Sequence, residues 1–255
     1  MEYLSARQLQ KGEVLELPDS NARYADIQYW DLRYTREDTY DWLLPYESYS
    51  HLLEQHVKKS DRILMLGCGN SLLSEYMYKD GYKNVENIDY SQVVIKKMSA
   101  HCDTCASMNW QVMDAKNLLY ENDRFDVVIE KATIDAMLVE EKDPWNVSDS
   151  AKTLVHSVLS EVSRVLGVGG RFISITFAQP HFRGPMYMSR ELNWSLQTFS
   201  FGTGFHYFFY LMRRGESVGE DVLPAYEMPP RDTSLRISTS SESDGADFIF
   251  KIADS

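Results

Sequence analysis

Glycine and carboxylate residues stand where three predicted strands end. Gly67 and Gly69 directly follow the apolar run 62–66 and open a predicted helix, so the backbone there can turn tightly and approach a ligand. Asp89 ends a second predicted strand, 22 residues after Gly67, where a carboxylate can accept both hydroxyl groups of a ribose. Asp114 ends a third predicted strand, where a carboxylate can accept the amino group of adenine. In this order, the residues predict a site for adenosine.

A glycine pair after a strand is weak evidence when it stands alone. It also fits an ordinary turn between a strand and a helix, or a nicotinamide dinucleotide site. Leu72 stands where a dinucleotide-binding loop usually has its third glycine, which disfavours binding of a pyrophosphate. A dinucleotide fold does not need the second acid, Asp114, either. The sequence therefore favours adenosine without a diphosphate, and a nicotinamide oxidoreductase is a remote alternative.

Alternating strands and helices must position these residues. Short apolar runs predict buried parallel strands, and amphipathic segments between them predict right-handed crossover helices. The predicted strands cover 62–66, 85–89, 110–113, 125–130 and 171–177, and the predicted helices cover 48–58, 71–79, 91–101 and 150–166. The glycines within 167–170 are predicted to end the last helix, and the runs 194–201 and 205–212 predict an antiparallel hairpin joined through 202–204. The predicted fold class is α/β, a Rossmann-like three-layer sandwich whose mostly parallel seven-stranded sheet ends in this hairpin.

Changes in composition predict the domain boundaries. Residues 1–23 are polar and mixed, which predicts an N-terminal extension, and residues 24–213 form one predicted domain. Residues 214–255 are rich in Pro, Ser, Asp and Glu, which predicts a mobile tail apart from one strand at 248–252.

The charge balance bears on possible partners. Among 255 residues, 38 acidic side chains exceed 26 basic ones, which gives a net charge of −12. This argues against direct contact with nucleic acid and is compatible with a cationic protein partner. No apolar run could span a bilayer and the N-terminus lacks a secretory signal, so we expect no membrane contact and a cytoplasmic location, with a nuclear fraction also compatible. Cys102 and Cys105 form a lone CxxC, which predicts reduced thiols and no metal site.

Several motifs together resemble a known family. The segments 63–71, 87–91 and 113–118 are similar to class I S-adenosylmethionine-dependent methyltransferases, and the likeness extends over about 24–212. A narrower resemblance is to the methyltransferase-like lysine methyltransferases of translation elongation factor 1-alpha. It rests on the motifs YWDLRY (29–34), YDW (40–42), LGCGNS (66–71), IDYS (88–91), EKATIDAML (130–138) and SEVSRVL–GG–RFISITF (160–177). The resemblance implies S-adenosylmethionine as the cofactor, S-adenosylhomocysteine as its product, and a lysine of elongation factor 1-alpha as the acceptor.

The resemblance also implies which residues contact the cofactor. With Gly69 of the glycine motif, they are Trp30, Tyr34, Trp42, Gly67, Asp89, Tyr90, Asp114, Ala115 and Lys131. Aromatic rings stabilise cations such as a sulfonium by about 0.5–2 kcal/mol, so the aromatic residues within 29–42 are predicted to form a lid, with ordinary core residues as the alternative. Tyr90 could pack on the adenine plane. Lys131 follows the fourth predicted strand at the expected switch point of the sheet, where it could contact the cofactor. The alternative interpretation is a solvent-exposed lysine without a role in binding.

One departure from the class concerns the residue two positions before Gly67. Many class I enzymes have an acid there that helps to orient the amino end of the cofactor, whereas this chain has Met65. Another group must therefore perform the role of that acid.

Methyl transfer to an amine requires a neutral lone pair behind the C–S bond. A lysine amine, with an unperturbed pKa of about 10.4, must first lose its proton, which a water-poor pocket favours. Glu130 and Asp135, in the segment EKATID, are predicted to flank the methyl group and to orient the amine as catalytic residues. For Asp135 the alternative is a residue of a helix N-terminus. The strand 125–130 is not followed by the Asn/Asp-Pro-Pro-Tyr/Phe turn that is typical of enzymes that methylate nucleobases or amides.

Three classes of function fit these residues. A protein lysine methyltransferase is favoured. A small-molecule methyltransferase is the runner-up, because no residue of the sequence separates the two acceptors. A cofactor-binding scaffold without turnover is the third class, and the intact EKATID segment argues mildly against it.

Overall fold

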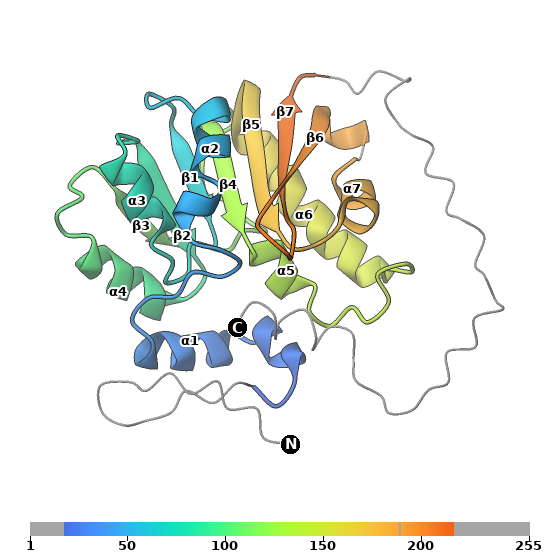
Figure 1. The fold of residues 1–255 in the computed structure, drawn as a ribbon, viewed down its shortest axis with the longest axis horizontal. Helices are drawn as coiled ribbons and strands as arrows, with labels where there is room; N and C mark the ends of the chain where they lie inside the picture. The colour runs from blue at the N-terminus through green and yellow to red at the C-terminus, as the bar shows by residue number, and fades with distance from the viewer. Residues whose placement is uncertain (1–17, 189, 217–255) are drawn as a thin grey trace.

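The computed structural model describes residues 18–188 and 190–216, in which seven strands form one sheet (Figure 1). The strands are β1 (Ile63–Leu66), β2 (Val85–Asp89), β3 (Asn109–Val112), β4 (Phe125–Lys131), β5 (Leu166–Thr176), β6 (Trp194–Phe201) and β7 (Tyr207–Arg214). Their order is β3-β2-β1-β4-β5-β7-β6, and β7 alone among them runs antiparallel to both of its neighbours. The predicted α/β class with a C-terminal antiparallel hairpin is confirmed.

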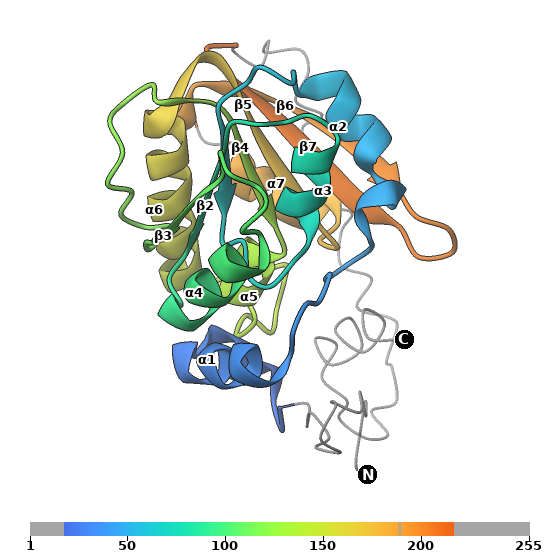
Figure 2. The ribbon, with the colours of Figure 1, turned by 90° about the vertical axis from the view of Figure 1, so that its left-hand side faces the viewer.

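Helices cover both faces of the sheet (Figure 2). The α-helices are α1 (Ile27–Arg36), α2 (Ser50–His56), α3 (Leu73–Lys79), α4 (Gln92–His101), α5 (Thr133–Met137), α6 (Asp149–Val165) and α7 (Pro180–Tyr187), with 3-10 turns at Asn21–Ala25, Tyr46–Ser48 and Arg190–Leu192. Side chains alternate between the two faces of a strand. Accordingly, α2, α3 and α4 pack with Ile63 and Met65 in one hydrophobic cluster, and α5, α6 and α7 pack with Leu64 and Leu66 in the other. These are the three predicted layers.

Polar residues fix where several helices begin. The Ser91 hydroxyl accepts a hydrogen bond from the backbone N–H of Val94 and so caps α4. Ser148 caps α6 in the same way, and the Asp26 carboxylate accepts from a backbone N–H in the first turn of α1. Such caps satisfy backbone donors that have no partner inside the helix.

Several predicted boundaries differ from the structure. α6 and β5 follow each other without a gap, so the glycines within 167–170 lie inside the strand and do not end the helix. Gly169 has a φ of 76°, and a Cβ on Gly170 would lie 2.7 Å from the carbonyl oxygen of Gly167. The glycines therefore allow a tight irregularity in β5, where its pairing with β4 also shifts register. The second hairpin strand, β7, begins two residues later than predicted.

Helix α1 was not predicted from the sequence; it lies beside the carboxyl ends of the parallel strands (Figure 1). Its buried face includes Arg33, whose Nε donates to Glu37 at 3.1 Å, and both side chains are almost fully buried. Lys97 of α4 donates to the carbonyl oxygen of Glu37 at 2.6 Å, and the Asn70 amide donates to its carboxylate at 3.0 Å. These bonds join α1 to α4 and to the loop after β1.

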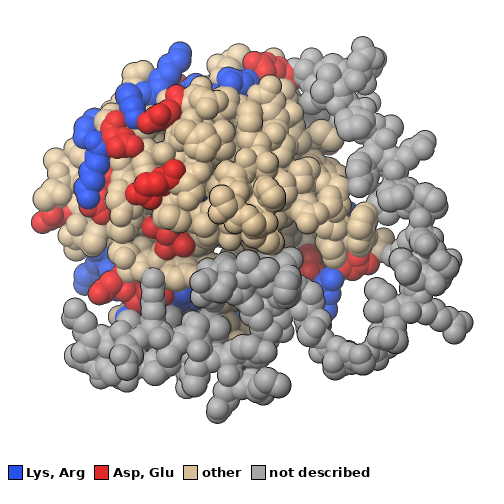
Figure 3. Space-filling view, viewed as in Figure 1, with Lys and Arg blue, Asp and Glu red and all other residues tan. Residues whose placement is uncertain are grey.

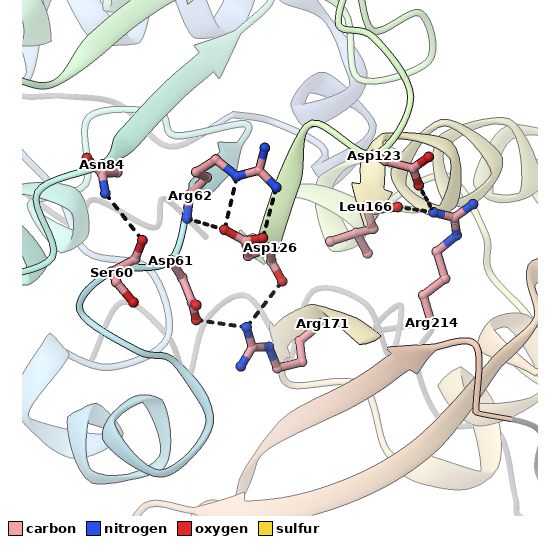
Figure 4. A network of polar contacts seen from close by, with 9 residues as sticks. All are labelled: Ser60, Asp61, Arg62, Asn84, Asp123, Asp126, Leu166, Arg171 and Arg214. Carbon is pink, nitrogen blue, oxygen red and sulfur yellow. Dashed lines mark hydrogen bonds and ion pairs between the residues drawn. The ribbon is translucent and has the colours of Figure 1, made fainter. Parts of the chain in front are cut away.

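Ion pairs connect the strands at the opposite edge of the sheet (Figure 4). Arg62, before β1, donates to both carboxylate oxygens of Asp126 in β4, at 3.1 and 2.9 Å. Arg171 of β5 donates to Asp61 at 2.8 Å, and Arg214 of β7 reaches the loop that precedes β4. The Arg62–Asp126 pair is exposed and contributes only about 0–1 kcal/mol, whereas the side chains of Arg171 and Asp61 are only 12% and 8% exposed.

Part of the predicted organisation lies outside the described residues. This holds for the strand at 248–252 and for most of the N-terminal extension and the tail, and the boundaries at 24 and 213 stay predictions. Within the described residues, no helix combines the length and apolar character needed to cross a membrane.

Candidate active site

A cavity of about 320 Å³ lies at the carboxyl ends of β1, β2 and β4. This is the point where the strand order reverses, from β1 to β4, and where open α/β sheets usually bind ligands. Its volume is within the range of small-molecule sites. The ten residues predicted to bind the cofactor all line it: Trp30, Tyr34, Trp42, Gly67, Gly69, Asp89, Tyr90, Asp114, Ala115 and Lys131.

The loop after β1 has room only for glycine at its two key positions. Gly67 has a φ of 65°, and a Cβ there would lie 2.5 Å from the side chain of Thr133. The Thr133 hydroxyl lies 3.0 Å from the carbonyl oxygen of Leu66 and 3.1 Å from that of Gly67. Gly69 has a φ of 50°, and its Cβ would lie 3.2 Å from the hydroxyl oxygen of Tyr34. The loop is thus held between α1 and the turn from β4 to α5.

Asp89 combines burial with unused hydrogen-bonding capacity. Its carboxylate accepts from the backbone N–H of Gly69 at 3.0 Å and from that of Ser91 at 2.9 Å. An ionised carboxylate has about four acceptor positions, so it can accept two further donors, such as the two hydroxyl groups of a ribose. Burial raises the pKa of Asp89 to about 6, although the backbone N–H bonds partly offset this.

We predict that cofactor affinity falls in acid as Asp89 takes up a proton. Since its pKa in the free protein is about 6 and a bound diol favours the carboxylate, affinity should be constant well above pH 6 and decrease below it. The decrease should approach about tenfold per pH unit. Calorimetric titration with S-adenosylhomocysteine between pH 5 and 8 measures this. Asp89→Asn, which cannot ionise, should bind more weakly with a flatter profile, and an unchanged slope in that variant would exclude Asp89 as the group that titrates.

The predicted adenine end of the cavity is more open to solvent. The Asp114 side chain is 47% exposed, and its carboxylate accepts from the backbone N–H of Lys116 at 2.9 Å. Ala115 is buried in the hydrophobic cluster on the α6 side of the sheet. Tyr90 is 39% exposed and lines the cavity, so its ring is accessible to a flat ligand without a rearrangement of the neighbouring residues.

The predicted lid residues belong to the cavity wall and to the hydrophobic core at once. Trp30 and Tyr34 of α1 are buried and stacked with ring centroids 5.5 Å apart. The Trp30 indole N–H donates to the carbonyl oxygen of Tyr24 at 2.7 Å. Trp42 is partly buried and packs against the same cluster, with its ring edge-on to Tyr24. The two alternatives, lid or core, are therefore not exclusive for these residues.

Lys131 is not a solvated lysine. Its side chain is 5% exposed and lines the cavity, and burial lowers its pKa. Its ammonium lies 3.4 Å from the carboxylate of Asp41 and donates to the carbonyl oxygen of Trp42 at 2.9 Å. Lys131 therefore ties the segment that contains the motif YDW to the end of β4.

The two predicted catalytic residues, Glu130 and Asp135, are not among the residues that line the cavity. Glu130 pairs with Leu66 in the sheet, and its carboxylate accepts from the backbone N–H groups of Thr133 and Ile134 at 2.9 and 3.3 Å. Burial and, next, the charge of Asp135 raise the pKa of Glu130 to about 7. Glu130 therefore holds the turn that carries Thr133 against the glycine loop, and its carboxylate lies behind the cavity wall.

Asp135 takes part in a buried ion pair. Its carboxylate accepts from the guanidinium of Arg183 and, at 2.6 Å, from the hydroxyl of Thr176. The side chains of Arg183 and Asp135 are only 5% and 1% exposed. The pair therefore joins α5 to α7 and to the end of β5, on the face of the sheet away from α1.

Several other residues of the cavity wall were not predicted to contact the cofactor. They include Tyr24, Tyr40, Met65, Thr133, Met137, Glu140 and Leu154. Tyr40 lies within the quoted motif YDW, and Thr133 and Met137 lie within EKATIDAML, so those motifs could have indicated them.

Cys102 and Cys105 are buried free thiols, and among the described residues no group of His, Cys, Asp and Glu could hold a metal ion.

Comparison with known proteins decides the family. A methyltransferase domain model matches residues 64–174. EEF1A lysine methyltransferase 4 of Mus musculus is 41% identical to this chain, over 93% of the chain and 95% of that protein. The protein of the same name from Bos taurus is 40% identical, over 94% and 96%. The chain belongs to this methyltransferase family.

More distant similarities agree with this assignment. The eEF1A lysine and N-terminal methyltransferase of Homo sapiens is 36% identical over 69% of this chain, which corresponds to 25% of that protein. Among solved structures, the N-methyltransferase NodS from Bradyrhizobium japonicum WM9, in complex with S-adenosyl-L-homocysteine, has a TM-score of 0.58 at 13% identity and covers 75% of this chain and 100% of its own. PH0226 protein from Pyrococcus horikoshii OT3 has a TM-score of 0.51 at 20% identity and covers 75% and 95%. These two structures show the shared fold.

As a member of this EEF1A lysine methyltransferase family, the chain is an S-adenosylmethionine-dependent methyltransferase. The residues of the cavity fit that cofactor. Asp89 offers acceptors for a diol, the glycine loop allows close approach of a ligand, and the aromatic wall suits a sulfonium cation. Lys131 offers a buried cation for a carboxylate.

Proposed function

We propose that this methyltransferase methylates a lysine side chain of a protein, and that the protein is translation elongation factor 1-alpha. The 41% identity to EEF1A lysine methyltransferase 4 across 93% of the chain is the observation that supports this most strongly. A methyltransferase domain alone fits many acceptors. The similarity to this relative also includes the segments before and after the matched domain, which in this fold can contact an acceptor. A cytoplasmic location would follow from such a substrate.

The cavity wall suits an amine acceptor. The cofactor supplies an activated methyl group on its sulfonium. Trp42, Ala136, Met137 and Leu154 give part of the cavity an apolar wall that can exclude water from the acceptor amine. Since burial lowers the pKa of a lysine ammonium, this wall favours loss of its proton. The exposed carboxylate of Glu140, also at the wall, can attract the ammonium before transfer.

We expect Glu130 and Asp135 to affect turnover through the position of the turn from β4 to α5. Glu130→Ala removes the acceptor of two backbone N–H groups, so the turn should shift and kcat should fall by about ten- to a hundredfold, with cofactor affinity changed less. Glu130→Gln keeps a carbonyl oxygen for those donors and should retain most of the activity. Steady-state kinetics and calorimetry on both variants measure this. If Glu130→Gln were as inactive as Glu130→Ala, Glu130 would exchange a proton with the acceptor instead.

The charge distribution gives the protein acceptor only weak support. The net charge of −12 would attract a lysine-rich partner, and a rate that falls with rising salt would reveal this contribution. On the face shown in Figure 3, however, basic and acidic side chains are interspersed and the middle is mainly uncharged. The acceptor therefore has to be identified directly.

Labelling a cell lysate tests the acceptor class. The purified enzyme and isotopically methyl-labelled cofactor are added to lysate, and proteins and small molecules are then separated and analysed by mass spectrometry. We expect label on lysine residues of protein. Label only on small molecules would favour the runner-up, a small-molecule methyltransferase. Absence of label despite normal cofactor binding would indicate a scaffold without turnover. The variant Asp89→Ala serves as the control for background activity of the lysate.

A further inference from the structure

Apart from Asp89, the cavity wall has no acidic residue within the glycine loop or at the end of β1. Met65, two residues before Gly67, is 3% exposed and lines the cavity, and its thioether cannot offset the charge of an ammonium group. The acidic residues of the wall are Asp89, Asp114 and Glu140. Asp89 is placed for the ribose, Asp114 follows β3, and Glu140 is exposed beyond α5. The ammonium group of the cofactor's amino-acid end needs a different partner.

Asp41 is not itself among the residues that line the cavity, but its carboxylate contacts two residues that do. Its Oδ1 accepts from the hydroxyl of Ser71 at 2.5 Å and lies 3.4 Å from the ammonium of Lys131. Ser71 and Lys131 both line the cavity. The segment is fixed in place because the backbone N–H of Tyr40 donates to the carbonyl oxygen of Asn70 at 3.2 Å. The chain thus brings Asp41 to the glycine loop from a distant part of the sequence.

The chemistry of the pair matches the amino-acid end of the cofactor. That end is a zwitterion with one ammonium and one carboxylate group. Lys131 and Asp41 are a cation and an anion side by side, with side chains 5% and 20% exposed. Both contacts of the Asp41 carboxylate are made by Oδ1, so Oδ2 can accept a further donor. Charge-assisted hydrogen bonds of this kind are strong where water is largely excluded.

We infer that Asp41 binds the ammonium group of S-adenosylmethionine and replaces the acid that Met65 cannot provide, while Lys131 binds the carboxylate. The inference rests on the cofactor alone and is independent of which acceptor is methylated. It assigns to Asp41 a direct contact with the ligand, beyond an effect on the position of Lys131.

Calorimetry with three ligands tests this on the full chain. The ligands are S-adenosylhomocysteine, an analogue that lacks its amino group, and an analogue that lacks its carboxyl group. Asp41→Asn, which keeps the shape of the side chain, should weaken the first and the third by about ten- to a hundredfold and leave the second within about twofold. The ratio of affinities for the two analogues is measured on one protein sample, so it does not depend on the folded fraction.

Two results would overturn the inference. A loss for the analogue that lacks the amino group as large as, or larger than, the loss for the analogue that lacks the carboxyl group would mean that Asp41 acts through the position of Lys131 or the shape of the site, and not by binding the ammonium group. No loss for any ligand would remove Asp41 from the site. Asp38→Asn is the matched control, because Asp38 is an acid of the same segment whose side chain is 93% exposed, lies 3.2 Å from the ammonium of Lys97 and is not among the residues that line the cavity. It should leave all three affinities unchanged, and a loss in that variant equal to the loss in Asp41→Asn would mean that the net charge of the segment, and not a contact of Asp41, sets the affinity.

Discussion

Substituting Arg183 by methionine should lower the free energy of unfolding by about 3–5 kcal/mol, because it leaves the carboxylate of Asp135 buried without its cation. Arg183 and Asp135 are only 5% and 1% exposed, so water cannot take the place of the guanidinium. A domain of this size has a total stability of about 5–15 kcal/mol, so the loss should be large enough to threaten folding at physiological temperature. Urea unfolding followed by circular dichroism measures it.

The double variant Arg183→Met with Asp135→Asn is the control. Removing both charges takes away the unpaired buried anion, so much of the lost stability should return. The hydroxyl of Thr176, 2.6 Å from Asp135, still has an oxygen acceptor in the asparagine. If the double variant is no more stable than Arg183→Met alone, the loss comes from packing of the long side chain and not from the ion pair.

Substituting Asp89 by alanine should weaken binding of S-adenosylhomocysteine by roughly ten- to a hundredfold, or about 1.5–3 kcal/mol. The variant loses the acceptor for the ribose hydroxyls. It also frees the backbone N–H groups of Gly69 and Ser91, which Asp89 now holds at 3.0 and 2.9 Å. Calorimetry at pH 7.5, on protein shown to be folded, measures the effect, and unchanged affinity would exclude Asp89 from the site.

Asp114→Ala is the matched comparison for Asp89→Ala. Both residues are acids that follow neighbouring strands, but the side chain of Asp114 is 47% exposed. Hydrogen bonds that water can replace contribute less, so Asp114→Ala should reduce affinity by several-fold at most. A larger loss for Asp114 than for Asp89 would contradict the proposed placement of the ribose and the adenine.

The site was predictable from sequence where it depends on strand ends. Asp89 and Lys131 end β2 and β4, and Gly67 and Asp114 come just after β1 and β3; the carboxyl ends of these strands meet at one edge in any parallel sheet of this order. Short apolar strands and capped helices indicate these ends without knowledge of the packing. The convergence of these residues around one cavity therefore follows from local sequence signals and one topological rule.

The role of Glu130 depends on which face of β4 it occupies. Glu130 stands two residues after Val128, which packs in the cluster with α5, α6 and α7, so its side chain points to that layer. Lys131 and Ile129 alternate with it, and Ile129 packs in the other cluster. Its place in the segment EKATID predicted that Glu130 flanks the methyl group, whereas the alternation of the strand places its side chain behind the cavity wall.

Helix α1 could not be recognised because a charged residue lies on its buried face. Tyr29, Trp30, Arg33 and Tyr34 have helical spacing and are all buried. Arginine normally marks a solvent-exposed face. Arg33 is buried because it pairs with Glu37, whose carboxylate also accepts from the distant Asn70, and because aromatic residues surround it. Such compensation comes from tertiary contacts, which a single sequence does not display.

Incubation of the purified enzyme with recombinant elongation factor 1-alpha and S-adenosylmethionine tests the central claim most directly. Mass spectrometry of the digested product should show an increase of one or more methyl groups on a specific lysine, and Asp89→Ala should strongly reduce it. The same assay with the elongation factor denatured shows whether the folded surface is needed. An enzyme that binds cofactor normally, methylates other acceptors from lysate and never modifies elongation factor 1-alpha would contradict the account.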